Sequence, residues 1–107
     1  MNSYKFKDIY IGLEENFYIN IDSTKFNKFT EITGDMNPLH IDSEYSKSRG
    51  FSSRIVYGML TASFYSTLVG MYLPGKYCIL QSIDTQFVKP VYDDDILNIS
   101  GKVNYIN

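Results

Sequence analysis

The sequence predicts an α+β domain in which an antiparallel sheet packs against a long apolar helix. Residues 15–21 alternate between polar and apolar side chains, residues 58–73 form an almost unbroken apolar run, and residues 77–88 alternate again. The order strand, helices, strand, strand is typical of an α+β fold. A length of 107 residues predicts one domain, residues 1–107.

The first strand and the first helix are predicted from local patterns. Residues 15–21 carry apolar side chains at alternate positions, namely Phe17, Ile19 and Ile21. Asp22 or Ser23 is suited to cap the N-terminus of a helix. The helix should present one apolar face and end at Gly34. That face consists of Phe26, Phe29 and Ile32.

Shorter elements are expected between the two main helices. A proline disfavours helical geometry in the residue before it, so Asn37-Pro38 predicts a loop or a tight turn. Residues 43–48 fit a short polar helix, and residues 54–56 look extended.

The second half of the chain predicts a buried helix followed by two strands. Residues 58–73 are apolar almost all round, which indicates a buried helix, and Pro74-Gly75 should end it. Strands are expected at residues 77–88 and 96–105, with a turn at residues 92–95.

Composition argues against several classes of protein. Hydrophobic residues make up 44% of the chain and aromatic residues 16%, enough to build a core. The formal net charge is -2 and no basic block occurs, so neither a nucleic-acid partner nor an electrostatic membrane anchor is expected. Cys78 is the only cysteine, and the N-terminus does not resemble a signal peptide. We therefore expect a cytoplasmic protein without a membrane span.

One short segment concentrates groups that could transfer protons. Residues 34–40 read Gly-Asp-Met-Asn-Pro-Leu-His and hold a carboxylate, an amide and the only histidine. Asp35 could accept a proton from water, His40 could hold that water or donate a proton, and Asn37 could position either group. An alternative is ordinary turn chemistry, in which Asp35 only satisfies nearby backbone amides.

A second segment could stabilise a developing negative charge. Residues 54–60 read Arg-Ile-Val-Tyr-Gly-Met-Leu, and Gly58 opens the predicted apolar helix. Backbone N–H groups at a helix N-terminus are unpaired and lie at the positive end of the helix dipole. They can therefore bind an oxyanion. The alternative is that Gly58 serves only close packing.

The two segments together resemble the MaoC-like, (R)-specific enoyl-CoA hydratases. These combine a Gly-Asp-x-Asn-Pro-x-His loop, here residues 34–40, with an Ile-Val-x-Gly-Met-Leu-x-Ala-Ser segment, here residues 55–63. Residues 73–75 and 87–91 are also similar, and the resemblance covers roughly residues 9–103. It implies a hot-dog fold, in which an antiparallel sheet wraps around a long central helix.

The resemblance implies a reversible hydration of trans-2-enoyl thioesters carried by CoA or an acyl carrier protein. Asp35 would be the general base, His40 would hold the water and protonate the α carbon, and Asn37 would assist them. The backbone N–H of Gly58 would bind the thioester oxygen, and Ser66 would support the Asp35 loop. No metal or cofactor is implied, and a homodimer is expected.

Three further residues are assigned to substrate contact, namely Arg54, Tyr57 and Met59. Many similar proteins carry histidine in place of Tyr57, which predicts altered substrate contacts rather than lost chemistry. Relatives also continue through two more strands after Asn107, so the domain is expected to be short of the last two strands. Two alternatives stay open: a hot-dog acyl-CoA thioesterase, and a non-catalytic acyl-binding or assembly module.

Overall fold

A computed structural model of the protein describes all residues, 1–107, and divides them into two units. The strand unit consists of Met1–Ile19, Ala62–Thr85 and Asn98–Asn107. The helical unit consists of Asn20–Thr61 and Gln86–Leu97.

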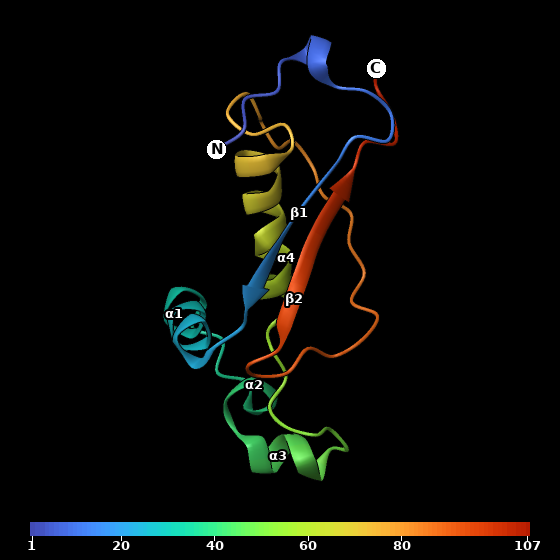
Figure 1. Ribbon diagram of the computed structural model, residues 1–107. Helices are drawn as coiled ribbons and strands as arrows, with labels where there is room; N and C mark the ends of the chain where they lie inside the picture. The colour runs from blue at the N-terminus through green and yellow to red at the C-terminus, as the bar shows by residue number, and fades with distance from the viewer. The chain divides into compact units, whose positions relative to one another are not determined.

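Strands β1 (Glu14–Asn20) and β2 (Ile96–Lys102) form a two-stranded sheet. They run side by side in opposite directions (Figure 1). Backbone hydrogen bonds beyond both ends of the strands continue the same antiparallel pairing. At one end Gly12 and Leu13 bond Val103, and at the other Ile21 bonds Asp94 and Asp95. Exposed and partly buried residues alternate along β1, as expected for a strand with one covered face. The strands predicted at residues 15–21 and 96–105 are confirmed, although β2 ends before Tyr105.

The strand unit builds its core where the sheet meets the end of the long helix. Phe17 on β1 stacks on Tyr72 with 5.0 Å between ring centroids. A Cβ atom at Gly101 on β2 would come within 2.7 Å of the Leu68 side chain, so glycine lets Leu68 pack closely on the strand. A short 3-10 helix, η1 (Phe6–Asp8), precedes β1.

Helix α1 (Ser23–Thr33) begins and ends where the sequence predicts. The Asp22 side chain accepts a hydrogen bond from the backbone N–H of Lys25 and so caps the first turn. Gly34 ends the helix with φ 71°, a left-handed conformation that glycine adopts without strain. Phe26 is buried on the inner face of α1 and is 1% exposed.

The Asn37-Pro38 segment is a helix start, and the predicted loop or tight turn is wrong on this point. Helix α2 (Pro38–Ile41) begins directly at the proline, and Asn37 is its N-cap. Proline is favoured in the first turn of a helix, because its φ angle fits and its missing N–H would have no partner there. The short polar helix expected at residues 43–48 is confirmed as α3 (Ser43–Ser48).

The long apolar helix forms as α4 (Gly58–Thr67), which continues into a π-helical turn, η2 (Leu68–Tyr72). The expectation that it is buried all round is wrong. Leu60 is the buried residue of α4, whereas Met59, Ser63, Tyr65 and Ser66 are exposed. A sheet of two strands presents too little surface to surround such a helix.

The strand expected at residues 77–88 is also wrong. Residues 79–91 have no regular secondary structure. The next residue, Tyr92, forms an isolated bridge with Ile55. A strand requires backbone pairing with a neighbour, and no strand pairs with this segment. Its apolar side chains are exposed, among them Ile79, Leu80, Ile83 and Val88.

The turn predicted at residues 92–95 is confirmed. The N–H of Asp95 bonds the Tyr92 carbonyl at 3.1 Å, and Asp94 takes a positive φ of 65°. None of the helices has the length and apolar character needed to span a bilayer.

Candidate active site

The Asp35 loop is fixed by hydrogen bonds of neighbouring residues. The Asp35 carboxylate accepts the backbone N–H of Asn37 at 3.0 Å, and the backbone N–H of Asp35 donates to the Thr33 hydroxyl at 3.2 Å. Asp35 is exposed. Its second carboxylate oxygen has no partner within the protein and can accept a hydrogen bond or a proton from a bound molecule.

Asn37 is held by the start of α2. Its side-chain oxygen accepts the backbone N–H of Leu39 at 3.0 Å and thereby caps the helix. This bond uses one lone pair of the oxygen, so the second lone pair and the amide nitrogen can still contact a bound molecule. The structure thus gives Asn37 a role in shaping the loop, in addition to the positioning role that the sequence predicts.

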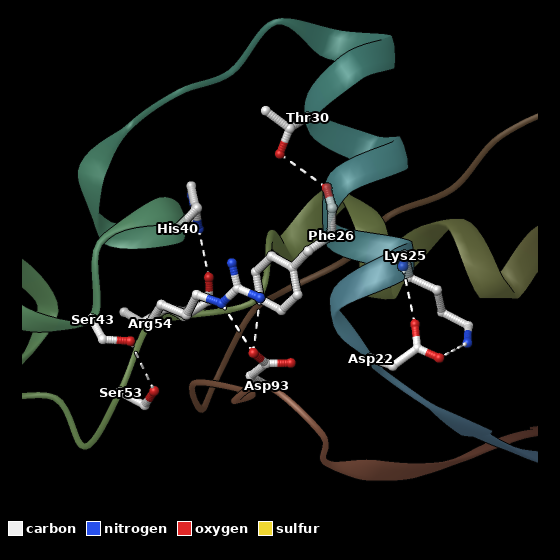
Figure 2. A network of polar contacts seen from close by, with 10 residues as sticks. Asp22, Lys25, Phe26, Thr30, His40, Ser43, Ser53, Arg54 and Asp93 are labelled. Carbon is white, nitrogen blue, oxygen red and sulfur yellow. Dashed lines mark hydrogen bonds and ion pairs between the residues drawn. The ribbon is translucent and has the colours of Figure 1, made fainter.

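His40 lies on α2 with its ring nitrogens in two different environments. Nδ1 is 2.7 Å from the backbone carbonyl oxygen of Ile55 (Figure 2). A carbonyl only accepts hydrogen bonds, so Nδ1 must carry the hydrogen. Nε2 is therefore the nitrogen that gains or loses a proton.

One cavity of about 290 Å³ brings the predicted groups together. Asp35, His40 and Gly58 all contribute to its wall, and the whole cavity belongs to the helical unit. Five further residues complete the lining: Phe29, Thr33, Tyr57, Met59 and Phe87. A carboxylate, an imidazole and a helix N-terminus around one apolar cavity are suited to proton transfer next to a developing oxyanion.

Gly58 is the first residue of α4 and faces the ring of Phe87. Its backbone N–H has no acceptor within the protein, as expected for the first position of a helix. A Cβ atom at this position would lie 3.1 Å from carbons of the Phe87 ring. Glycine therefore lets the Phe87 ring lie close to the first turn of α4.

A second cavity, of about 370 Å³, shares His40, Gly58 and Phe87 with the first. Most of its other lining residues are apolar, including Phe51, Ile55, Val56 and Val91. Lys89 is the one cationic side chain in its wall. The two cavities together give a mainly apolar ligand room on both sides of His40.

Arg54 lines neither cavity and is held by a partner within the protein. Its Nε and Nη2 atoms donate to the same Asp93 carboxylate oxygen at 3.1 and 2.8 Å, and the guanidinium lies 4.0 Å above the Phe26 ring (Figure 2). The structure thus places Arg54 as a link between α1 and the turn at residues 92–95. Ser66 is exposed on the part of α4 that belongs to the strand unit.

Tyr57 is buried, with 2% of its side chain exposed, so it offers little surface to a substrate. Its hydroxyl donates to the backbone carbonyl of Asp35 at 2.7 Å, and its ring stacks on His40 with 4.1 Å between centroids. Thr30 also contacts this hydroxyl, at 2.5 Å. Sequence reasoning missed Thr30, because the contact joins residues 27 positions apart and no local pattern reports it.

The comparisons with known proteins establish the family. Residues 12–106 match the family described as MaoC like domain. Because the match spans most of the sequence, the chain belongs to the MaoC-like domain family.

Individual relatives agree with this assignment. The chain is 35% identical over 98 residues to a 3-hydroxybutyryl-CoA dehydratase of Methylorubrum extorquens, which covers 92% of this chain and 62% of the relative. It is 33% identical over 98 residues to an (R)-specific enoyl-CoA hydratase of Rhodospirillum rubrum, covering 92% of this chain and 68% of the relative. The chain thus spans about two thirds of the length of these relatives.

Solved structures share the fold. An (R)-hydratase from A. caviae, involved in PHA biosynthesis, superimposes with a TM-score of 0.89 at 29% identity, covering 94% of this chain and 76% of that structure. The R-hydratase PhaJ1 from Pseudomonas aeruginosa gives a TM-score of 0.85 at 27% identity, with 92% and 64% covered. The α+β, hot-dog fold predicted from the sequence is thereby confirmed.

Proposed function

We propose that the protein catalyses the reversible hydration of trans-2-enoyl thioesters to (R)-3-hydroxyacyl thioesters. One observation carries the proposal: the Asp35 carboxylate, the His40 imidazole and the N-terminal Gly58 of α4 line the same cavity. The relatives named as enoyl-CoA hydratases and dehydratases support the reaction type.

The chemistry requires one base, one acid and a site for negative charge. Asp35 removes a proton from water while the water oxygen bonds to the β carbon of the enoyl group. The electrons of the double bond move toward the thioester carbonyl, whose oxygen is stabilised by the N–H of Gly58. His40, protonated at Nε2, then donates a proton to the α carbon. Water has been added across the double bond, and solvent returns Asp35 and His40 to their starting states.

The Ile55 carbonyl prepares His40 for this role. It fixes the ring through Nδ1, so that only Nε2 can face the reacting molecule. The same bond stabilises the imidazolium, because a carbonyl dipole interacts favourably with the positive charge. Asp35 and His40 are therefore oriented by bonds that do not involve their reactive atoms.

The nature of the thioester carrier is also part of the proposal. Two apolar cavities that meet at His40 fit an acyl chain and the apolar part of a carrier arm. A CoA thioester and an acyl-carrier-protein thioester present the same enoyl group to the site, and relatives named for each carrier are similar to this chain.

The test is turnover of crotonyl-CoA, in which the 3-hydroxyacyl product and the free CoA thiol are measured in parallel. A hydratase removes the conjugated enoyl absorbance, releases no free thiol and yields the (R)-3-hydroxy product. Release of CoA thiol would indicate a thioesterase instead. Binding without any reaction on short and medium enoyl thioesters would indicate an acyl-binding module and contradict the proposal.

A further inference from the structure

We infer that Tyr57 is a positioning residue that holds both Asp35 and His40 at the cavity, an inference whose catalytic meaning rests on the proposed function. Asp35 follows α1, His40 lies on α2, and Tyr57 directly precedes α4. A single buried side chain thus joins three segments that each supply one part of the site.

The Tyr57 hydroxyl controls the backbone of the Asp35 loop. It lies 2.7 Å from the Asp35 carbonyl oxygen, and this oxygen has no other partner within the protein. The bond is non-local, since 22 residues separate the two. Farther along, Leu39 and His40 are tied to Ile55, whereas the other bonds of residues 34–37 join residues close in sequence, such as Asp35 with Thr33 and Asn37. Such local bonds shape a turn but do not anchor it to the rest of the protein.

The Tyr57 ring controls the orientation of His40. The two rings are stacked with an interplanar angle of 29° and 4.1 Å between centroids. Because the Ile55 carbonyl holds Nδ1 and the Tyr57 ring covers one face, the imidazole cannot rotate freely. Phe29 packs against the same tyrosine ring with 4.8 Å between centroids, which keeps Tyr57 itself in place.

Thr30 is the second polar neighbour of the Tyr57 hydroxyl. Thr30 Oγ1 lies 2.5 Å from the Tyr57 hydroxyl oxygen and 2.9 Å from the Phe26 carbonyl oxygen. The Asp35 carbonyl can only accept, so Tyr57 must use its one hydrogen there. The Thr30 hydroxyl has one hydrogen, which either the Phe26 carbonyl or the Tyr57 oxygen can accept, and in both cases Thr30 is a close polar neighbour of the Tyr57 hydroxyl. Thr30, Tyr57 and the Asp35 carbonyl thus form one line of polar contacts from α1 to the loop that follows it.

The variants Tyr57→Phe and Thr30→Val test these contacts. Tyr57→Phe keeps the ring on His40 and removes the hydroxyl, while Thr30→Val removes the hydroxyl that contacts Tyr57 and keeps the side-chain shape. Tyr45→Phe is the matched control, because Tyr45 is 39% exposed on α3 and its hydroxyl has no hydrogen bond. Thr30→Ser keeps the hydroxyl and should restore the wild-type behaviour.

Two readouts are needed. In Tyr57→Phe, exchange of the Asn37, Leu39 and His40 amides with solvent should accelerate roughly five- to tenfold, the effect of one lost hydrogen bond. Amides of α3, such as that of Ser46, should keep their rates, because the opening is local. With crotonyl-CoA, kcat should fall by a similar factor while KM changes less than about twofold, since loop geometry matters most in the transition state.

Thr30→Val should change both readouts in the same direction but less, and the double variant should resemble Tyr57→Phe alone. The inference is overturned if Tyr57→Phe matches Tyr45→Phe in loop exchange and kcat. It is also overturned if α3 amides accelerate as much as the loop amides, which would mean general destabilisation. If the wild type shows no turnover, the proposed function fails, and loop exchange still decides whether Tyr57 holds Asp35.

Discussion

Nδ1 of His40 lies 2.7 Å from the carbonyl oxygen of Ile55, and the ring of Tyr57, two residues further along the chain, stacks on the same imidazole. The carbonyl assigns the ring hydrogen to Nδ1 in the neutral state. The reactive nitrogen of the only histidine in the chain is therefore determined by backbone geometry.

The tautomer of His40 is directly measurable. In the neutral protein we expect hydrogen on Nδ1 and a lone pair on Nε2, because a carbonyl oxygen cannot donate. Nitrogen-15 chemical shifts of the neutral imidazole distinguish the two tautomers. A spectrum showing hydrogen on Nε2 would contradict the orientation described for His40.

Replacing Gly58 by alanine should affect activity more than stability. The new Cβ would lie 3.1 Å from the Phe87 ring, but this side chain is 57% exposed and can rotate away. We expect the free energy of unfolding to change by less than about 1 kcal/mol, as measured by urea denaturation. Because Phe87 lines both cavities, kcat/KM should fall by about tenfold. Full activity in Gly58→Ala would argue against the importance of this contact.

Arg54→Ala should destabilise the protein without weakening substrate binding. The guanidinium gives two hydrogen bonds to Asp93, and their loss should reduce the free energy of unfolding by about 2 kcal/mol. The Asp93 carboxylate, whose Oδ1 is already buried without a partner, would then lose its only counter-charge. Arg54→Lys should restore little, because lysine cannot form the forked contact. A large rise in KM for the CoA thioester with unchanged stability would instead assign Arg54 to substrate binding.

Asp22 should make part of the stability of the helical unit depend on pH. The backbone N–H of Lys25, followed by other contacts with the same residue, lowers the pKa of the Asp22 carboxyl below its usual 3.8. Its contribution is complete above pH 3.8 and is lost as the pH falls through the lowered pKa. Thermal melts from pH 6 to pH 2 should therefore show a smaller loss for Asp22→Asn than for the wild type. Parallel curves would show that the cap does not depend on ionisation.

Local patterns in the sequence predicted the elements that depend on neighbours along the chain. Asp22 and Gly34 delimit α1 through hydrogen bonds to residues within one turn, and the polar segment at residues 43–48 forms α3 within the predicted bounds. The Asp35 and His40 motif was also recognisable, because both residues lie within six positions of each other.

Features that depend on distant partners could not be predicted. Residues 77–88 alternate like a strand, but alternation does not supply a pairing partner. The link from Arg54 to Asp93 could not be predicted either, because the two residues lie 39 positions apart. The buried role of Tyr57 likewise depends on Thr30 and Asp35, which α1 and the loop after it bring together.

The most direct test compares crotonyl-CoA hydration by the wild type with that of Asp35→Asn and His40→Gln. Asp84→Asn, which removes a carboxylate outside the helical unit, is the matched control. We predict that both site variants stay folded and lose kcat by roughly 10²- to 10⁴-fold, whereas Asp84→Asn keeps the wild-type rate. Equal rates in all four folded proteins would contradict the proposed acid–base roles of Asp35 and His40.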